Sequence, residues 1–291
     1  EYSYACKKLG IKILPPDINY GEGAFSVDHG NIRYGLTAIK SLGRPVIEAI
    51  IRERNLNGPY RDFKDLVERL SSKEINKRTV ENLIKSGALD CFHVTRKQQM
   101  IVYASVIDSI QKERKNEIAG QMSLMDLLGE EDQQSFQISY PDVGEYEKEQ
   151  KLAMEKEVLG IYVSGHPLED DIERLERSVT AHTSDFVIDE ETGKTKIHDR
   201  ESCIIGGLIS EMSVKLTKKN QNMAFITLED LRGTVEVVVF PRQYATYQSL
   251  LREDAKVFIK GTTQISEEES KVICNQIISF EDSRQELWIQ F

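Results

Sequence analysis

The spacing of apolar residues changes once along this chain, and that change constrains the fold more than any other feature. Between residues 37 and 115 apolar residues recur at helical intervals, whereas from residue 202 onward they alternate as in β-strands. One layer of structure cannot follow both spacings, so we predict a multidomain α+β chain. A length of 291 residues fits this prediction, because domains of about 100–150 residues are usual.

The helical part divides into short segments. We predict helices over residues 37–41, 45–55, 62–70, 76–86 and 95–114, with breaks that carry Gly43, Gly58 and Gly87. Pro45 lies at the start of its helix, where a missing N–H costs little. Ahead of these helices, two β-prone runs flank a turn-forming tetrad at 28–31, which predicts a hairpin over residues 24–36.

The second part of the chain reads as strands. We predict them at 202–214, 223–230, 233–240, 256–263 and 271–280, with a short helix at 243–251. Five strands with a helix after the third is the order of an OB-fold, a small five-stranded Greek-key barrel. The predicted fold is therefore an all-α domain followed by an OB-fold β-barrel.

The net charge of −10 is unevenly distributed. Residues 30–115 contain 17 Lys or Arg and 10 Asp or Glu, a net charge of +7, whereas residues 116–201 contain 8 and 22, a net charge of −14. A basic module beside an acidic connector suggests that one part of the chain faces a polyanion. The alternative is a simply solvated surface.

The first candidate site is a helix-turn-helix pattern over residues 39–51, with its turn at Leu42-Gly43. Gly43 permits a close turn, so that main-chain N–H groups at the next helix N-terminus could meet a phosphate. Lys40 and Arg44 flank the turn and would add charge. This is the pattern of a helix-hairpin-helix unit, and Lys40, Ser41, Leu42, Gly43 and Arg44 are its candidate DNA-backbone residues. The alternative is an αα-corner packed in a core.

A second, weaker unit follows about 45 residues later. A helix over 75–85 leads into the turn Ser86-Gly87-Ala88, and Arg96 and Lys97 open the next helix. Two such units in one basic segment favour sequence-independent binding to the DNA backbone. The candidate residues of this unit are Lys77, Arg78, Lys85, Gly87, Arg96 and Lys97.

The barrel carries a third candidate. The loop after its first strand contains Lys215, Lys218, Lys219 and Asn220, and OB-folds meet single strands through this loop and the face of strands two and three. Phe225 on the second strand is a candidate for stacking on a base. The alternation of residues 224–229 leaves open whether Phe225 faces outward or into the core.

Residues 116–144 read as an acidic, loosely structured linker. Within it, Gln121, Leu124 and Met125 lie in a short apolar segment that has no core of its own. Such a segment could enter a partner's groove, or it could dock on neighbouring helices.

No residues form a convincing catalytic or metal-binding pattern. The five histidines are scattered, and the four cysteines form no CxxC pair, which fits a reducing cytosol. No apolar stretch approaches the roughly 18–20 residues that span a bilayer. The first residues do not resemble a signal peptide and include no initiator Met, so we expect a cytoplasmic fragment of a longer protein.

The order of these parts resembles the C-terminal half of the bacterial DNA polymerase III alpha-subunit family, over essentially the whole chain. The resemblance rests on four segments, at residues 10–19, 32–40, 83–90 and 159–168. Helical hairpins ahead of the barrel resemble the DnaE form, whereas the PolC form places its OB domain near the N-terminus.

The resemblance implies a domain order. Residues 1–36 would end the fingers region, 37–115 would be a tandem helix-hairpin-helix domain on duplex DNA, and 116–144 the linker with a clamp-binding motif. Residues 145–201 would be a helical connector, 202–280 the OB domain near the single-stranded template, and 281–291 the start of a tail domain.

The resemblance also implies partners and chemistry. Gln121, Leu124 and Met125 occupy the places of the internal sliding-clamp (beta subunit) motif, with Met125 where the family usually has Phe. The family polymerises DNA with Mg²⁺ held by aspartates upstream of this segment, so no catalytic residue, metal ligand or cofactor is expected here. The missing tail would meet the clamp loader.

Three alternatives stay open at this point. The chain could be an accessory region of a DNA-repair nuclease or ligase. It could be an RNA-binding OB module of the anticodon type. It could also be a structural scaffold that binds nothing.

Overall fold

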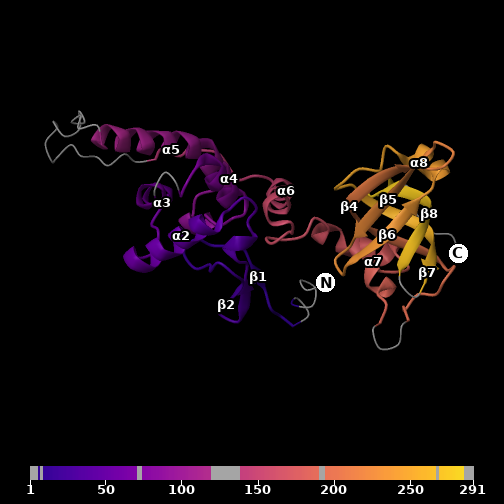
Figure 1. Cartoon of the computed structure of the whole chain (residues 1–291). Coiled ribbons are helices and arrows are strands. Elements are labelled where there is room, and N and C mark those ends of the chain that lie inside the picture. Colours follow the sequence, from indigo (N-terminus) through magenta and orange to yellow (C-terminus); the bar gives the residue numbers. More distant parts are fainter. Residues whose placement is uncertain are drawn as a thin grey trace. The chain divides into compact units, whose positions relative to one another are not determined.

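The computed structural model describes residue 6 and residues 9–70, 74–118, 138–189, 194–266 and 269–284. The chain divides into two compact units. The first, Cys6–Gly165, is helical with one small sheet, and the second contains the β-barrel and begins at His166 (Figure 1). The prediction of a helical part followed by a β part is confirmed.

The helical unit begins with a three-stranded sheet. Its strands are β1 (Ile13–Leu14), β2 (Ser26–Asp28) and β3 (Asn31–Arg33), in the order β1-β3-β2. Strands β2 and β3 form the predicted antiparallel hairpin. Its two turn residues, His29 and Gly30, have φ of 47° and 79°, as a tight hairpin turn requires.

The helices of this unit follow the predicted breaks. They are α2 (Arg44–Asn57), α3 (Phe63–Arg69), α4 (Lys77–Lys85), α5 (Arg96–Ile118) and α6 (Lys148–Leu159). Asp62 and Asn76 cap α3 and α4 by accepting hydrogen bonds from the third residue of each helix. The segment predicted as a helix at 37–41 is instead a 3-10 turn, η1 (Leu36–Ala38), because the backbone is already extended at Ile39, with φ of −74° and ψ of 117°. A further 3-10 turn, η2 (Asp90–Phe92), lies between α4 and α5.

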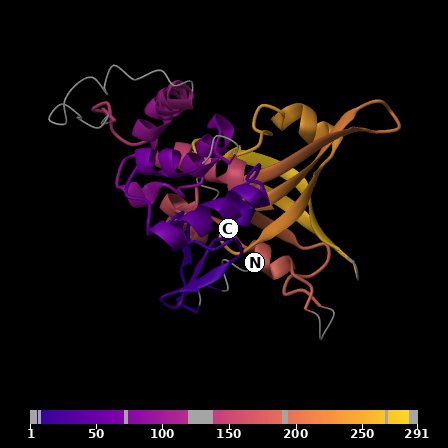
Figure 2. The same ribbon diagram turned by 60° about the vertical axis from the view of Figure 1, so that its left-hand side comes forward.

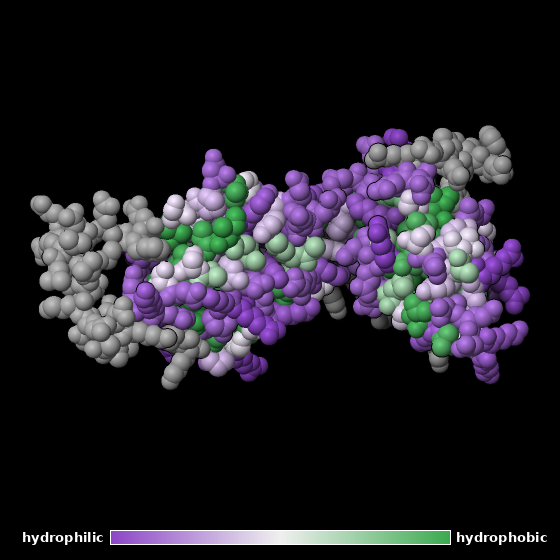
Figure 3. All heavy atoms as spheres, turned by 90° about the horizontal axis from the view of Figure 1, so that it is seen from above, coloured by the Kyte–Doolittle hydropathy of each residue, from purple (hydrophilic) through white to green (hydrophobic). Residues whose placement is uncertain are grey.

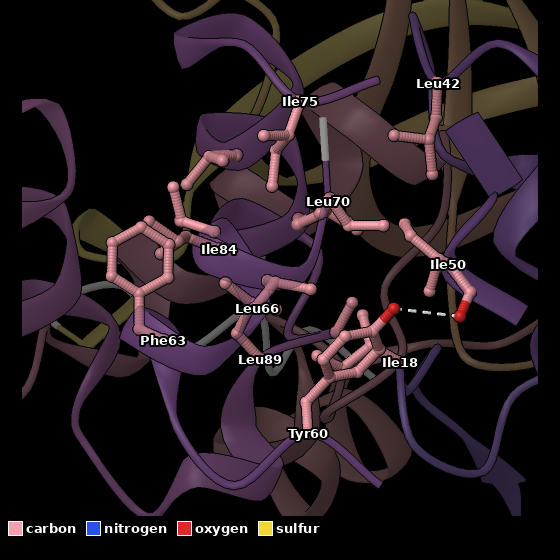
Figure 4. Packing of buried hydrophobic residues seen from close by; sticks show 14 of the residues in the cluster. Ile18, Leu42, Ile50, Tyr60, Phe63, Leu66, Leu70, Ile75, Ile84 and Leu89 are labelled. Atoms are coloured by element: carbon pink, nitrogen blue, oxygen red, sulfur yellow. Dashed lines mark hydrogen bonds between the residues drawn. The ribbon is translucent and has the colours of Figure 1, made fainter. Parts of the chain in front are cut away.

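Apolar side chains from all these elements meet in one core. Phe63, Leu66 and Ile84 are fully buried, and the hydroxyl of Tyr60 donates to the carbonyl of Ile50 at 2.9 Å (Figure 4). The apolar spacing read from the sequence therefore marks the faces that pack together. In Figure 3 polar and charged side chains cover most of the visible surface, with small apolar areas between them.

The second unit is a closed five-stranded barrel. Its strands are β4 (Ser202–Leu216), β5 (Asn222–Glu229), β6 (Thr234–Val239), β7 (Lys256–Ile265) and β8 (Ser270–Ser279), and they pair in the order β4-β5-β6-β8-β7 (Figure 2). Strands β6 and β8 pair in parallel, and β7 closes the barrel on β4. Helix α8 (Pro241–Tyr247) follows the third strand, beginning two residues earlier than predicted because Pro241 opens it. The OB-fold prediction is confirmed.

Short elements flank the barrel strands. They are η4 (Glu169–Asp171), α7 (Ile172–Ser178) and η5 (Thr183–Phe186) before β4, and η6 (Asp282–Arg284) after β8. Gly206 on β4 lets α7 approach, since a Cβ there would lie 2.7 Å from both Leu175 of α7 and Phe258 of β7. Helix α7 therefore packs directly on the barrel wall.

Candidate nucleic-acid interface

Most arginines of the basic segment serve the fold of the helical unit. Arg54 is 7% exposed and donates to the carbonyls of Ile18 and Gly21. Arg69 donates to the carbonyls of Glu53 and Gly58, and Arg114 donates to the carbonyl of Leu70, at the end of α3. The charge of the segment therefore overstates how many cations remain available to a ligand.

The cations of the corner at Lys40–Arg44 differ from these arginines, because the corner is open to solvent. Lys40, Ser41, Gly43 and Arg44 are all exposed, and only Leu42 is buried, as the apolar anchor of the corner. In the described part of the chain, the side chains of Lys40 and Arg44 meet no acidic partner. The corner thus presents two cations that the fold does not use.

The main chain of this corner also faces outward. The amide of Leu42 donates to Ile39, whereas those of Ser41, Gly43 and Arg44 donate to no acceptor among the described residues. Gly43 is the N-cap of α2 and provides no side-chain cap. Three free N–H groups at the positive end of a 14-residue helix form a site that suits a phosphate oxygen.

A third cation reaches this corner from α4. The guanidinium of Arg78 donates to Oγ of Ser41 at 3.2 Å. The tertiary fold therefore brings together Arg78 and the first corner, which the sequence assigned to separate hairpins. Lys40, Arg44 and Arg78 with the three amides define what we call the open corner.

Asn82 is the residue of this site that the sequence analysis missed. Its side-chain amide donates to the carbonyl of Lys40 at 2.7 Å, and Asn82 itself is 9% exposed. The signal was present, since Asn82 lies one helical turn after Arg78 and so shares its face of α4.

The second predicted corner is closed. Gly87 is buried with φ of 80°, and its amide donates to the carbonyl of Ile84. The guanidinium of Arg96 lies over Gly87 where a side chain would otherwise project. Arg96 is 1% exposed and pairs with Asp90 at 2.8 Å and Glu155 at 3.0 Å. The prediction that Gly87 and Arg96 contact DNA is corrected, because neither reaches solvent.

The N-terminus of α5 is occupied as well. The carboxylate of Glu145 accepts hydrogen bonds from the backbone amides of Arg96 and Lys97, both at 3.2 Å. Burial acts to raise the pKa of Glu145, but hydrogen bonds from the backbone amides of Tyr146, Arg96 and Lys97 outweigh it and lower the pKa. Glu145 therefore stays ionised and fills the place that a phosphate would need.

The other basic candidates of the second predicted hairpin have partners within the protein. Lys77 pairs with Asp108 at 2.7 Å, and Lys85 pairs with both Glu81 and Glu157 at 2.9 Å. Lys97 lies 5.9 Å from the ring centre of Tyr146. A ligand would have to compete for each of them, so the open corner is the better site.

The barrel settles which way Phe225 points. Ala224, Ile226 and Leu228 are buried inside, so Phe225 lies on the outer face of β5. Its cross-strand neighbours are Ser213 of β4 and Val238 of β6. Phe225 is therefore placed where a base could stack on it.

The basic loop lies next to this ring. Lys218, Lys219 and Asn220 form the exposed tip between β4 and β5, and Asn220 has φ of 56°. The ammonium of Lys215 lies 4.6 Å from the centre of the Phe225 ring. The hairpin end of the barrel thus combines an aromatic platform with lysines, as single-strand sites do.

Three other expectations concern features outside the two sites. Gln121, Leu124 and Met125 lie outside the described residues. In the residues that the structure does describe, no group of three or more His, Cys, Asp or Glu is arranged to hold a metal ion. No described helix has the length and apolar character needed to cross a membrane.

Two family models match this chain. Residues 10–99 match the helix-hairpin-helix motif, and residues 204–279 match the OB-fold nucleic acid binding domain. These ranges cover the open corner and the barrel with its basic loop.

Curated relatives match almost the whole chain. The DNA polymerase III subunits alpha of Mycobacterium leprae, Borreliella burgdorferi and Escherichia coli are 32%, 33% and 32% identical over 95–96% of it. The chain spans only 23–24% of the length of these relatives. A solved structure of the mitochondrial single-stranded DNA binding protein Rim1 from S. cerevisiae covers 28% of the chain, with 14% identity and a TM-score of 0.24, too low to support an argument.

Proposed function

Because this chain is related over nearly its whole length to bacterial DNA polymerase III alpha subunits, we propose that it is the DNA-holding portion of such a polymerase. The open corner binds the backbone of duplex DNA, and the hairpin end of the barrel binds the single-stranded template. Synthesis itself is assigned to residues of the longer protein, where aspartates would hold Mg²⁺. The chain's own task is to keep that enzyme on DNA.

One observation carries the proposal: the open corner directs three unpaired amides and three cations to one exposed point. Phosphate contacts of this kind read no base, so binding is independent of sequence. They also release counterions, so the affinity falls as salt rises. The direct experiment measures the affinity of the whole chain for several unrelated duplexes across a salt series. A strong preference for one sequence, or affinity that salt does not change, would contradict the proposal.

The barrel site leads to a separate prediction. Replacing Phe225 by Ala should weaken binding of a single-stranded oligonucleotide by about 1–3 kcal/mol, because a stacked base loses its platform. Fluorescence anisotropy with labelled oligo-dT measures the change. Phe240→Ala is the matched control, since Phe240 is an exposed phenylalanine of the same barrel unit that lies at the start of α8. Equal losses in both variants would remove Phe225 from the site.

The same anisotropy assay, with other nucleic acids, decides between the DNA proposal and an RNA-binding module. The family model that matches the barrel is described as an OB-fold nucleic acid binding domain, which does not decide for DNA. A polymerase portion should hold primed DNA at least as well as RNA hairpins of the same length. A clear preference for RNA hairpins would favour the anticodon-type alternative.

We further propose that the segment with Gln121, Leu124 and Met125 tethers the chain to the sliding clamp, and that the longer protein meets the clamp loader and works in the cytoplasm. Support for these points is the family resemblance. In calorimetry the whole chain should bind the clamp, and Gln121→Ala with Leu124→Ala should remove the heat, because the apolar anchor and its glutamine are lost. No heat from the parent chain, and no competition with a known clamp ligand, would remove this proposal.

A further inference from the structure

The open corner contains a turn whose central peptide can face either way. The amide of Leu42 donates to the carbonyl of Ile39 at 3.2 Å, which closes a turn over residues 39–42. Ser41 has φ of 61°, whereas Lys40 is not among the residues with positive φ. A negative φ followed by a positive φ describes a type II turn. Ser41 occupies the position where Gly or Asn is preferred.

The alternative is a type I turn, in which Ser41 would have a negative φ and so would avoid the unfavourable left-handed backbone. Types I and II differ by a rotation of the peptide between the two central residues. Here that peptide joins Lys40 and Ser41, and its rotation would exchange the directions of the Lys40 carbonyl and the Ser41 amide. A carbonyl oxygen would then face an incoming phosphate, and like partial charges repel.

Asn82 holds one of the two groups that this rotation would move, the Lys40 carbonyl. Its side-chain amide donates to the carbonyl of Lys40 at 2.7 Å from a buried position on α4. On the other side of the same residue, the Lys40 amide donates to the carbonyl of Val158 on α6 at 2.8 Å. The Lys40 carbonyl is therefore held toward the protein, which leaves the Ser41 amide directed away from it.

We infer that Asn82 is a positioning residue for the phosphate site. It fixes the Lys40–Ser41 peptide so that the corner offers a donor, and not an acceptor, to the DNA backbone. Asn82 itself contacts no DNA in this scheme. The inference rests on the proposed function of the open corner. It names the residue that decides whether the corner presents an N–H group or a carbonyl oxygen.

The test is a double-mutant cycle in the whole chain. Asn82→Ala should weaken duplex binding about fivefold, the effect of one lost hydrogen bond, because the turn becomes free to rotate. Ser41→Gly removes the penalty for a positive φ. Adding Asn82→Ala to the Ser41→Gly chain should therefore weaken binding much less than it does in the parent chain.

A matched control separates positioning from general loss of stability. Gln99 is 1% exposed and its side-chain amide donates to the carbonyls of Leu89 and Val94 in the same unit. Gln99→Ala removes the same kind of bond away from the corner, so it should leave duplex affinity unchanged. The amide resonance of Ser41 gives a second readout, since Asn82→Ala should shift it and Gln99→Ala should not.

The outcomes are distinct. The inference is overturned if Asn82→Ala binds duplex as the parent does, or if its loss is the same with Ser41 and with Gly at position 41. The proposed function fails separately, if charge reversal at Lys40, Arg44 and Arg78 leaves duplex binding unchanged. A corner that binds DNA but ignores Asn82 would therefore be recognised as such.

Discussion

Replacing Lys40, Arg44 and Arg78 together by Glu is expected to abolish retention of duplex DNA in a low-salt gel shift. Each change turns an attractive contact with a phosphate into a repulsive one, and all three lie at one corner. In a salt series with the parent chain, these three phosphate contacts should account for about three units of the slope of log affinity against log salt, one unit for each contact. Far-UV circular dichroism should be unchanged, because Lys40, Arg44 and Arg78 form no ion pair among the described residues and the guanidinium of Arg78 donates to Oγ of Ser41.

The control must change the net charge by the same amount at another place. Lys12, Lys112 and Lys196 are exposed and lie far from residues 40–44 and 78 in the sequence. Their replacement by Glu should weaken binding only slightly, through the general field of the protein. If both triple variants lose the same affinity, or if neither does, the open corner is not the binding site.

The second large effect concerns stability. Arg96→Met should destabilise the helical unit by about 3–5 kcal/mol, because it leaves Glu155 buried without its counter-charge. Glu155 is 0% exposed and lies 3.0 Å from Arg96. Its other oxygen accepts from the amides of Val163 and Ser164, both at 2.9 Å. The pair therefore connects the corner at Gly87 with α6 and with residues 163–164 at the end of this unit.

Urea denaturation followed by circular dichroism measures this loss. Arg96→Met with Glu155→Leu should recover part of it, since the uncompensated charge is gone. The pair Arg52–Glu74, 3.5 Å apart, provides the contrast, because the Arg52 side chain is 67% exposed. Arg52→Met should cost less than about 1 kcal/mol. Equal losses from Arg96→Met and Arg52→Met would show that the buried pair does not hold this unit together.

The two corners show where sequence reasoning works and where it stops. Both have a glycine, flanking cations and a following helix, and so both predict a phosphate site. The fold leaves Gly43 at the surface but covers Gly87 with the Arg96 side chain. Whether a glycine opens a backbone or admits a neighbouring side chain depends on contacts from distant parts of the chain, and these are not visible in local spacing.

Phe225 makes the same point on the barrel. Alternation places it on the opposite side from Ala224, Ile226 and Leu228, but it does not say which side is the core. Closure of the barrel decides the question, because only one face of β5 can point into it. The aromatic side chain that the sequence left undecided is thus on the outer face of β5, where the ammonium of Lys215 lies 4.6 Å from its ring centre.

By itself the sequence determined the two-part architecture, the positions of the barrel strands along the chain and the corner at Lys40–Arg44, since each depends on local periodicity and on turn and cap residues. The tertiary structure alone decided which cations remain free, that Arg78 joins the first corner and that Glu145 closes the second. The physical reason is that charge and hydrogen bonding at a surface depend on partners far away in the sequence, as Asn82 and Lys40 are. Composition gives the number of charged and polar residues, whereas the fold decides which of them contact each other.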